Sequence, residues 1–212
     1  TILNLICGNT LPDSGEIIFN GKDLTKEKEY KRYRRIGRVF QNPALGNCSN
    51  MTVLENLMLA ENKNKAWNLK KMKDNSREKF VEMLKPLGLG LENKMDSPIN
   101  DLSGGQRQSV SLLMTTLSDI ELLVLDEHTA ALDPKTGEKV MQITKKIVEE
   151  RNLTTIMVTH NLEHAIEYGN RIIMLHEGEI ILDLSGEEKE NTKMDDILNL
   201  FNQISIRRGN SV

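Results

Sequence analysis

Several common features are missing from this sequence of 212 residues, and each absence narrows what the chain can be. No run of 18 apolar residues occurs, so no segment is typical of a helix that crosses a membrane by itself. Cysteine is scarce, because Cys7 and Cys48 have neither CxxC spacing nor the number that a disulfide framework needs. The cysteine content therefore favours two ordinary thiols in a reducing compartment.

An excess of positive charge is also missing. The chain has 28 Lys and Arg residues against 31 Asp and Glu residues, for a formal net charge of −3. This balance argues against a protein that mainly binds nucleic acid. The charge run KEKEYKRYRR at 26–35 mixes acids with bases, so we expect a solvated helix or loop there. With 38% hydrophobic residues, the chain can build one sizeable core, or one core with a smaller lobe.

The first third of the chain predicts a short helix, a hairpin and a strand. The opening TILNLICGNT ends its helix at Gly8, and its apolar residues recur at helical spacing: Ile2, Leu5 and Ile6. The next segment predicts a strand at 17–19 that turns back at Asn20-Gly21. A further short strand, IGRVFQNP at 36–43, stops at its proline.

A long helical region is predicted to follow. Thr52 and Glu55 form a capping box that opens one helix. Residues 69–86 predict a second, amphipathic helix, whose apolar members are Met72, Phe80, Met83 and Leu84. The stretch 88–101 is rich in turn formers and is interpreted as a linker. From Ser103 onward, a third helix has apolar residues at i, i+3, i+4 and i+7, namely Val110, Leu113, Met114 and Leu117.

The last part of the chain alternates strands with helices. ELLVLDE at 121–127 is an unbroken apolar run, which is typical of a strand buried on both faces of a parallel sheet. Asp133-Pro134 predicts the start of a helix that runs to about Arg151, and TTIMVTH at 154–160 predicts another buried strand. A helix through Tyr168 precedes RIIMLHEGEIIL, a hairpin that turns at 177–178. This order predicts an α/β fold built on a parallel sheet.

Polar residues follow three of the predicted strands. Gln41 follows RVF, Asp126 and Glu127 follow LLVL, and His160 follows IMVT. Ligands of parallel sheets bind beyond the carboxyl ends of the strands, so we expect these side chains at one edge. Four apolar residues followed by an acid form the Walker B arrangement, in which Asp126 helps to hold Mg²⁺ beside nucleotide phosphates. Glu127 is then placed to polarise an attacking water.

LSGGQ at 102–106 is the most specific motif. Ser103 is suited to cap the helix, while Gly104 and Gly105 let an anion approach the backbone closely. The free N–H groups and the positive end of the helix favour a phosphate there.

With these motifs, the chain resembles the ATP-binding cassette family over nearly its whole length. The matching segments occur in family order: PDSGEI (12–17), FQNP (40–43), LSGGQRQ (102–108), LLVLDEHTAALDP (122–134) and VTH (158–160). The resemblance implies a P-loop NTPase-like parallel sheet with a helical lobe and a small antiparallel β portion. It further implies one nucleotide-binding domain over 1–212, a helical subdomain at about 50–118 and a C-terminal helical tail at about 185–212.

The resemblance also implies roles for individual residues. Gln41 is the Q-loop residue that senses Mg²⁺ and water, Asp126 the magnesium acid, and Glu127 the general base. Asp133 is the D-loop acid, and His160 is the switch histidine on the γ-phosphate. The nucleotide lies between two cassettes and is contacted in trans by four signature residues: Ser103, Gly104, Gly105 and Gln106. ATP and Mg²⁺ are the implied cofactors.

The implied partners are a second cassette, an integral membrane permease and, indirectly, a substrate-binding protein, with no nucleic acid. Such a subunit lies in the cytoplasm, on the inner face of the membrane. In the family a phosphate-binding loop ending in Gly-Lys-Ser/Thr precedes a helix like TILNLICG. We therefore expect Thr1 to stand just after the Mg²⁺-binding Ser/Thr, and the 212 residues alone to bind ATP poorly.

Two departures from the common pattern stand out. His128 replaces the proline of many members, and the signature helix reads SVSLLMTTL instead of an Ala/Arg-rich sequence. Neither removes a catalytic group, and both resemble a narrower bacterial branch linked to small-molecule uptake, including aromatic amino acids. Import is the function that the resemblance favours. The alternatives are a cassette ATPase that acts on nucleic acid or ribosomes, and a non-catalytic scaffold. The compact lobe without heptads or CxxC argues against the DNA-repair relatives.

Overall fold

The computed structural model describes residues 1–63 and 76–199. It consists of two compact units, Thr1–Val158 and Thr159–Val212. The first part of the predicted helix 69–86, with Met72, lies outside the described residues, and so does the end of the C-terminal tail. None of the described helices is long and apolar enough to cross a membrane.

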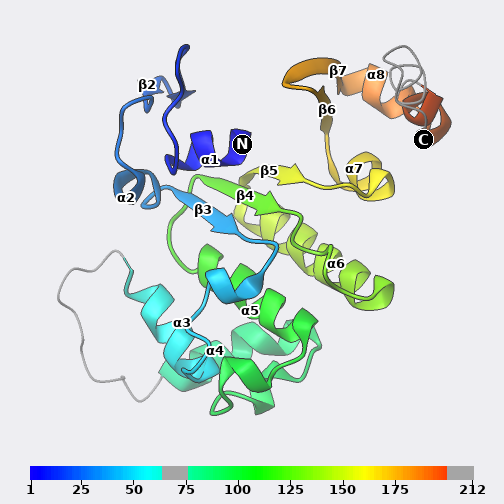
Figure 1. The fold of residues 1–212 in the computed structure, drawn as a ribbon. Coiled ribbons are helices and arrows are strands. Elements are labelled where there is room, and N and C mark those ends of the chain that lie inside the picture. Colours follow the sequence, from blue (N-terminus) through cyan, green and yellow to red (C-terminus); the bar gives the residue numbers. More distant parts are fainter. Residues whose placement is uncertain (64–75, 200–212) are drawn as a thin grey trace. The chain divides into compact units, whose positions relative to one another are not determined.

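A parallel sheet of three strands forms the centre of the first unit (Figure 1). β4 (Leu122–Asp126) lies between β3 (Ile36–Val39) and β5 (Thr154–Val158). Its partners are in register, with Val39 opposite Leu125 and Asp126 opposite Val158. The predicted apolar run is buried as expected, since Leu122 to Leu125 are all at most 4% exposed. The carboxyl ends of the three strands therefore meet at one edge, and the predicted parallel sheet is confirmed.

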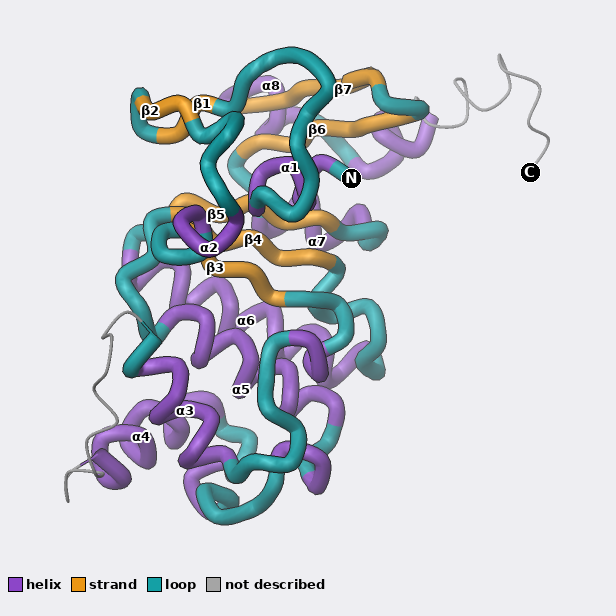
Figure 2. Tube along the Cα trace, turned by 60° about the vertical axis from the view of Figure 1, so that its left-hand side comes forward, coloured by secondary structure: helices purple, strands orange, loops and turns teal. Residues whose placement is uncertain are grey.

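Alternation along the strands divides the core into two clusters on opposite faces of the sheet. Figure 2 shows α1 on one side of these strands and α5 (Gly104–Thr116) and α6 (Pro134–Arg151) on the other. One face packs against α1 (Ile2–Cys7) and presents Ile36, Leu122 and Val124. The other face packs against the helices and presents Val39, Leu123 and Leu125. Successive side chains of a strand point to opposite faces of the sheet. Residues at even and odd positions of one strand therefore belong to different clusters.

β5 differs from its prediction as a buried strand. Its residues range from partly buried to exposed, and Val158 is 40% exposed. The reason is position, because β5 is an edge strand of the three-stranded sheet, and among residues 1–63 and 76–199 it pairs with β4 alone. The interpretation as a strand was right, whereas the expected burial on both faces was wrong.

The first helix follows the prediction in length. α1 ends at Gly8, which adopts φ 85° and accepts the left-handed conformation that glycine tolerates. Its buried residues are Leu3 and Cys7, whereas Ile2 is 47% exposed. Helical spacing identified the helix, and Ile6 packs partly buried against the cluster of Leu3 and Cys7.

The charge run at 26–35 contains a fully buried arginine, contrary to the expectation of a solvated segment. Arg32 ends α2 (Glu29–Arg32) and is 0% exposed. Nη1 donates to the carbonyls of Leu5 and Ile6, at 2.7 and 3.0 Å, where the helix dipole of α1 is negative. The other N–H groups donate to the carbonyls of Glu27, Leu24 and Thr25. All five guanidinium donors are thus satisfied by backbone, which makes burial of the charge tolerable.

The short hairpin before this segment is present as predicted. β1 (Ile18–Phe19) and β2 (Lys22–Asp23) pair antiparallel. Between them, Asn20 and Gly21 have φ 49° and 72°. Positive φ at both central positions is the geometry of the turn that Asn-Gly favours between antiparallel strands.

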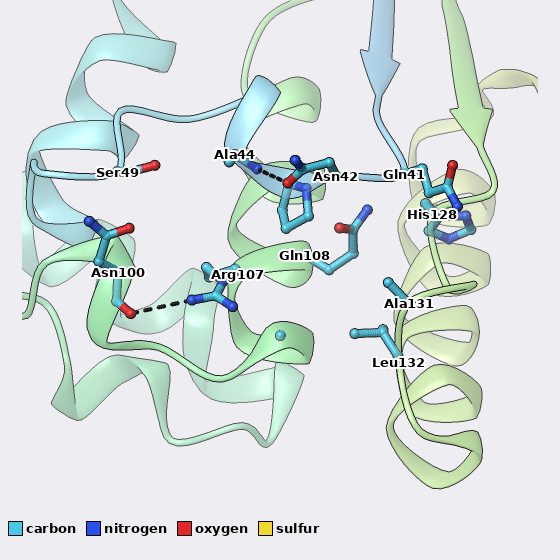
Figure 3. A pocket seen from close by; sticks show the side chains of 12 residues that line it. Gln41, Asn42, Ala44, Ser49, Asn100, Arg107, Gln108, His128, Ala131 and Leu132 are labelled. Atoms are coloured by element: carbon cyan, nitrogen blue, oxygen red, sulfur yellow. Dashed lines mark hydrogen bonds between the residues drawn. The ribbon is translucent and has the colours of Figure 1, made fainter.

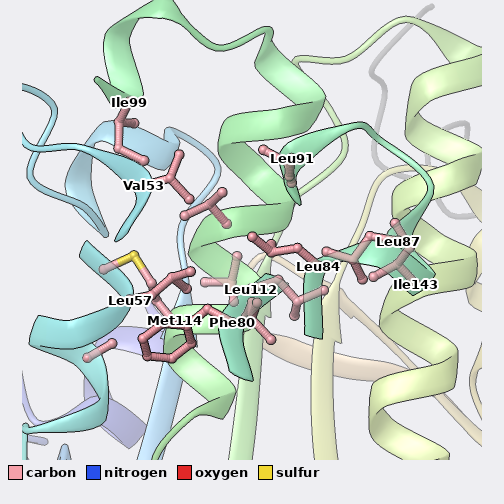
Figure 4. Close-up of a cluster of buried hydrophobic side chains, with 14 of the residues drawn as sticks. Val53, Leu57, Phe80, Leu84, Leu87, Leu91, Ile99, Leu112, Met114 and Ile143 are labelled. Atoms are coloured by element: carbon pink, nitrogen blue, oxygen red, sulfur yellow. The ribbon is translucent and has the colours of Figure 1, made fainter. Parts of the chain in front are cut away.

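Three helices form the lobe that the sequence predicted between 50 and 118. These are α3 (Val53–Glu61), α4 (Ser76–Leu84) and α5 (Gly104–Thr116). The Thr52 capping box is present, and Phe80 and Leu84 are fully buried in the shared core (Figure 4). Whether this lobe is a separate subdomain stays a prediction.

The stretch 88–101 is more than the linker that was predicted. It contains 3₁₀ turns at Leu91–Asn93 and Ile99–Asp101. Leu91, Met95 and Ile99 are at most 1% exposed and pack into the same core as α4 and α5. Turn-forming residues dominate the sequence of this stretch. The three buried apolar residues, which are four residues apart, were therefore overlooked.

α6 (Pro134–Arg151) starts and ends where the sequence predicted. Asp133 caps it by accepting a hydrogen bond from the Thr136 N–H, and Pro134 takes the first helical position. The helix ends at Asn152, which adopts φ 49°. α6 packs against α5 and supplies Ile143 to the core.

The second unit contains α7 (Leu162–Tyr168), β6 (Arg171–His176), β7 (Glu179–Ser185) and α8 (Gly186–Asn191), and residues 194–199 are also helical. β6 and β7 form the predicted hairpin, with Glu177 and Gly178 at positive φ. β6 pairs antiparallel with β7 in a two-stranded sheet, as the hairpin prediction requires. β-hairpin pairing satisfies the strand locally and requires no crossover.

Replacement of Arg32 tests whether its clamp on the backbone stabilises the fold. Arg32→Met removes five hydrogen bonds from a fully buried guanidinium to backbone carbonyls, one bond buried and four part-buried, so we expect the free energy of unfolding to fall by about 3 kcal/mol. Arg34→Met is the matched control, because Arg34 is exposed on the same segment and we expect a change within about 0.5 kcal/mol. Urea unfolding measures the free energy of unfolding of both variants. Equal effects of the two substitutions would contradict a stabilising role of the Arg32 hydrogen bonds.

Candidate active site

The end of β4 brings the two candidate acids to the carboxyl edge of the sheet. Asp126 is the last residue of the strand, and the Glu127 N–H donates to the Val158 carbonyl at 2.9 Å, which extends the pairing with β5. Glu127 itself adopts φ 45°, a left-handed conformation that costs a residue with a side chain on the order of 1 kcal/mol. Strain of this kind concentrates at functional sites, which supports the role expected for Glu127.

Asp126 is paired with an arginine that the sequence interpretation overlooked. Arg38 Nη2 lies 2.6 Å from Asp126 Oδ2, and the two side chains are 9% and 30% exposed. The signal was available, since Arg38 has the same parity as the buried Ile36 and must face the core. A charge at an inward position requires a partner, and the acid that ends the neighbouring strand is the nearest one in the pattern.

Gln41 lies in a cavity of about 450 Å³ that joins three functional segments (Figure 3). The cavity is lined by the segment that follows β3, by the start of α5 and by the loop that follows Glu127. Gln41 and His128 lie together on one side of it, and Gly104 comes from the signature motif. Asp126, Ser103, Gly105 and Asp133 are outside the lining, so this cavity unites only part of the predicted site.

The segment after β3 is anchored to the signature helix by side chains that were not singled out from the sequence. Gln108 is 1% exposed, and its Nε2 donates to the Phe40 carbonyl, next to Gln41, at 3.1 Å. Asn47 Nδ2 donates to the Pro43 carbonyl at 2.8 Å and to Ser111 Oγ at 3.2 Å. Ser111 is one of the residues in which the signature helix departs from the common pattern, so the departure has a local structural use.

Ser103 caps α5 as predicted, through a reciprocal capping box. The Gln106 N–H donates to Ser103 Oγ, and the Ser103 N–H donates to Gln106 Oε1 at 3.1 Å. Gln106 Nε2 also donates to the Leu89 carbonyl at 2.9 Å, so this side chain stabilises its own chain. The first N–H groups of the helix, those of Gly104 and Gly105, have no acceptor within a helix and can bind an anion. The contact of these residues with a nucleotide in trans stays a prediction.

The two signature glycines differ in their surroundings. A Cβ at Gly105 would lie 2.1 Å from Thr136 Cγ2, which is closer than any real contact, because α5 and α6 meet there. A Cβ at Gly104 would lie 3.2 Å from the end of the Leu132 side chain. Packing against Thr136 therefore leaves no room for a side chain at position 105. This requirement is additional to the predicted phosphate contact.

The loop between Glu127 and α6 is held at both ends. His128, which stands where many relatives have proline, is 2% exposed, and its Nε2 lies 3.1 Å from Thr144 Oγ1. The Thr144 hydroxyl donates to the Val140 carbonyl, so His128 is the donor in this pair. At the other end, hydrogen bonds from Thr136 lower the pKa of Asp133. The ionised Asp133 carboxylate therefore stabilises α6 fully at pH values above the usual pKa of an aspartate. This stabilisation is lost as the pH falls through the lowered pKa of Asp133.

His160 belongs to the second unit, two residues beyond the end of β5. In that unit Asn161 caps α7 by accepting a hydrogen bond from the His164 N–H at 3.2 Å, which fixes the start of the helix. The role of His160 on a γ-phosphate stays a prediction.

Comparison with known proteins decides the family. The family model described as ABC transporter matches residues 1–130. The chain belongs to the ABC transporter family. The tyrosine transport ATP-binding protein of Clostridioides difficile (strain R20291) is 50% identical over 201 residues, which cover 95% of this chain and 80% of that protein. The phosphonates import ATP-binding protein PhnC 1 of Ruegeria sp. (strain TM1040) is 33% identical and covers 93% and 77%.

A solved structure agrees with the sequence comparisons. A dimeric ATP-binding cassette in a post-hydrolysis state, bound to ADP and Pi, superposes with a TM-score of 0.72 at 32% identity. It covers 87% of this chain and 78% of its own. This ABC cassette is thus an ATP-binding, ATP-hydrolysing subunit of an ABC transporter with the α/β P-loop NTPase fold, as the resemblance implied.

The contact between Gly105 and Thr136 allows packing to be separated from ligand binding. We expect Gly105→Ala to lower the free energy of unfolding by about 1–3 kcal/mol, because the new methyl group overlaps Thr136 Cγ2. Thr136→Ser removes that methyl group and should restore most of the loss in the double variant. Gly104→Ala is the control with the same gain in helix propensity and a smaller clash. A full loss in the double variant, measured by urea unfolding, would contradict the packing role.

Proposed function

We propose that this ABC ATPase energises the uptake of a small molecule through a separate membrane permease, and that the cargo is an aromatic amino acid. The observation that carries the proposal is the edge of the sheet, where the acids that end β4 stand in register beside the strands leading to Gln41 and His160. The importer assignment is supported by two relatives, one named for tyrosine transport and one for phosphonates import.

The donor set at this edge suits Mg²⁺. Asp126 offers a carboxylate and Gln41 an amide oxygen, the oxygen donors that Mg²⁺ prefers. Among the residues that the structure describes, no group of three or more His, Cys, Asp or Glu side chains converges on one point. That pattern fits a metal held jointly by one carboxylate and the phosphates of a nucleotide. When bound, Mg²⁺ neutralises charge that develops on the transferred phosphoryl group.

The residues of the chain then divide the work of hydrolysis. Glu127, held at the strand end by its bond to Val158, accepts the proton of the attacking water. His160 contacts the γ-phosphate of the same nucleotide. Ser103 and the N–H groups of Gly104 and Gly105 approach the γ-phosphate bound by a second copy of the chain, with Gln106 holding their loop in shape. Asp133 sets the start of the helix beside that contact.

In a dimer of two cassettes, binding and hydrolysis of ATP change the conformation of the pair. A nucleotide held between two cassettes favours the closed pair over the open one, and hydrolysis removes that preference. Gln41 and the cavity beside it transmit the change to the permease, since the Q-loop segment is tied to the signature helix through Gln108. On this proposal the subunit works in the cytoplasm, at the inner face of the membrane, with a substrate-binding protein serving the permease.

Glu127→Gln tests the proposed base and the transport role together. In the full-length protein we expect ATP hydrolysis to fall at least about 100-fold while ATP binding is retained, because an amide cannot accept the proton. Glu121→Gln is the matched control, since Glu121 precedes the opposite end of the same strand. Phosphate release and nucleotide trapping in a dimer measure the outcome.

In cells that depend on this subunit, tyrosine uptake should be lost with Glu127→Gln and kept with Glu121→Gln. Uptake that persists with the inactive variant would contradict the transport role. Recovery of the protein with nucleic acid at physiological salt, and without a membrane protein, would favour the alternative class of cassette ATPases.

A further inference from the structure

Arg38 occupies a position that strand geometry ties to Asp126. It pairs with Val124 in the register of β3 and β4, and Asp126 stands two residues further along β4. Side chains two residues apart lie on the same face of a sheet, so Arg38 and Asp126 are diagonal neighbours on the face toward α1. The contact therefore follows from the fold and requires no special conformation of a loop.

The guanidinium of Arg38 is held by several groups at once. Nη2 forms the ion pair with Asp126 Oδ2 at 2.6 Å. Nη1 donates to Asn4 Oδ1 at 2.8 Å and to Asn9 Oδ1 at 3.2 Å, and the guanidinium carbon lies 4.8 Å from the centre of the Phe40 ring. Its side chain is 9% exposed. An arginine restrained by α1, β3 and β4 together keeps its charge beside the carboxylate.

The geometry engages one oxygen of Asp126 and leaves the carboxylate accessible. Only Oδ2 is bonded to Arg38, and the Asp126 side chain is 30% exposed. Arg38 Nε is buried and has no acceptor among the described residues, so the guanidinium is not fully satisfied. A buried charge with an unused donor is a costly way to stabilise a strand pair, which points to a role at the site that Asp126 serves.

We propose that Arg38 is a positioning residue that makes metal binding at Asp126 depend on the nucleotide. This inference rests on the proposed function, in which Asp126 is the magnesium acid. The positive charge of Arg38 offsets the negative charge of the Asp126 carboxylate. A divalent cation therefore gains little binding free energy from Asp126 alone. The phosphates of a nucleotide supply the missing negative charge, and the metal binds with them. The site thereby excludes free Mg²⁺ from the empty cassette.

Manganese binding to the full-length protein tests the inference without relying on hydrolysis. Mn²⁺ is titrated with and without a non-hydrolysable ATP analogue, and the free ion is followed by electron paramagnetic resonance. We expect the unmodified protein to bind Mn²⁺ tightly only with the analogue. Arg38→Met should bind Mn²⁺ about tenfold more tightly without nucleotide, because the repelling charge is gone. Arg38→Lys retains the charge and should behave as the unmodified protein does.

Two further variants keep the outcomes separate. Arg35→Met removes a positive charge that is paired with Glu27 instead of Asp126, and it should leave Mn²⁺ affinity unchanged. Equal tightening by Arg35→Met, or no tightening by a folded Arg38→Met, would overturn the inference. Asp126→Asn addresses the proposed function itself. If it leaves binding of Mn²⁺ with the analogue intact, the magnesium assignment fails; if it abolishes that binding while Arg38→Met changes nothing, only the role of Arg38 fails.

Discussion

Parallel pairing of β4 with both of its neighbours is the constraint on which the rest of the structure depends. Residues 36, 122 and 154 start three strands far apart in sequence, and one register aligns their ends. A slip by one residue would move every side chain of β4 to the opposite face, which would take Asp126 away from Arg38 and the face toward α1. The same register fixes where Asp126 and Glu127 leave the sheet, so packing energy and site geometry have a common origin.

Two arginines connect the first helix to this sheet. Arg32 binds the last carbonyls of α1, and Arg38 binds the side chains of Asn4 and Asn9. Both are largely buried, and each makes several directed hydrogen bonds, to which Arg38 adds its ion pair with Asp126. α1 is therefore held by polar groups on one side and by Leu3 and Cys7 on the other. Its position relative to Asp126 is set by these contacts.

The sequence predicted the element order, the central strand, the capping boxes and the α6 boundaries, because each depends on local chemistry. It could not predict that β5 is an edge strand or that Arg32 is buried, since those depend on neighbours distant in sequence. Among the candidate site residues, motifs singled out Gln41, Ser103 and Asp126, whereas Arg38 and Gln108 were overlooked. In a sequence, a buried polar residue looks the same as an exposed one until its hydrogen-bond partners are known.

Metal-directed cleavage measures most directly whether the parallel register places Gln41 and Asp126 at one cation. The full-length protein is loaded with ATP and Fe²⁺ in place of Mg²⁺, and peroxide with ascorbate then breaks peptide bonds beside the metal. The account predicts cuts in two segments, next to Gln41 and next to Asp126, that both disappear when excess Mg²⁺ is added. Cuts at only one of these segments, or at neither, would contradict it.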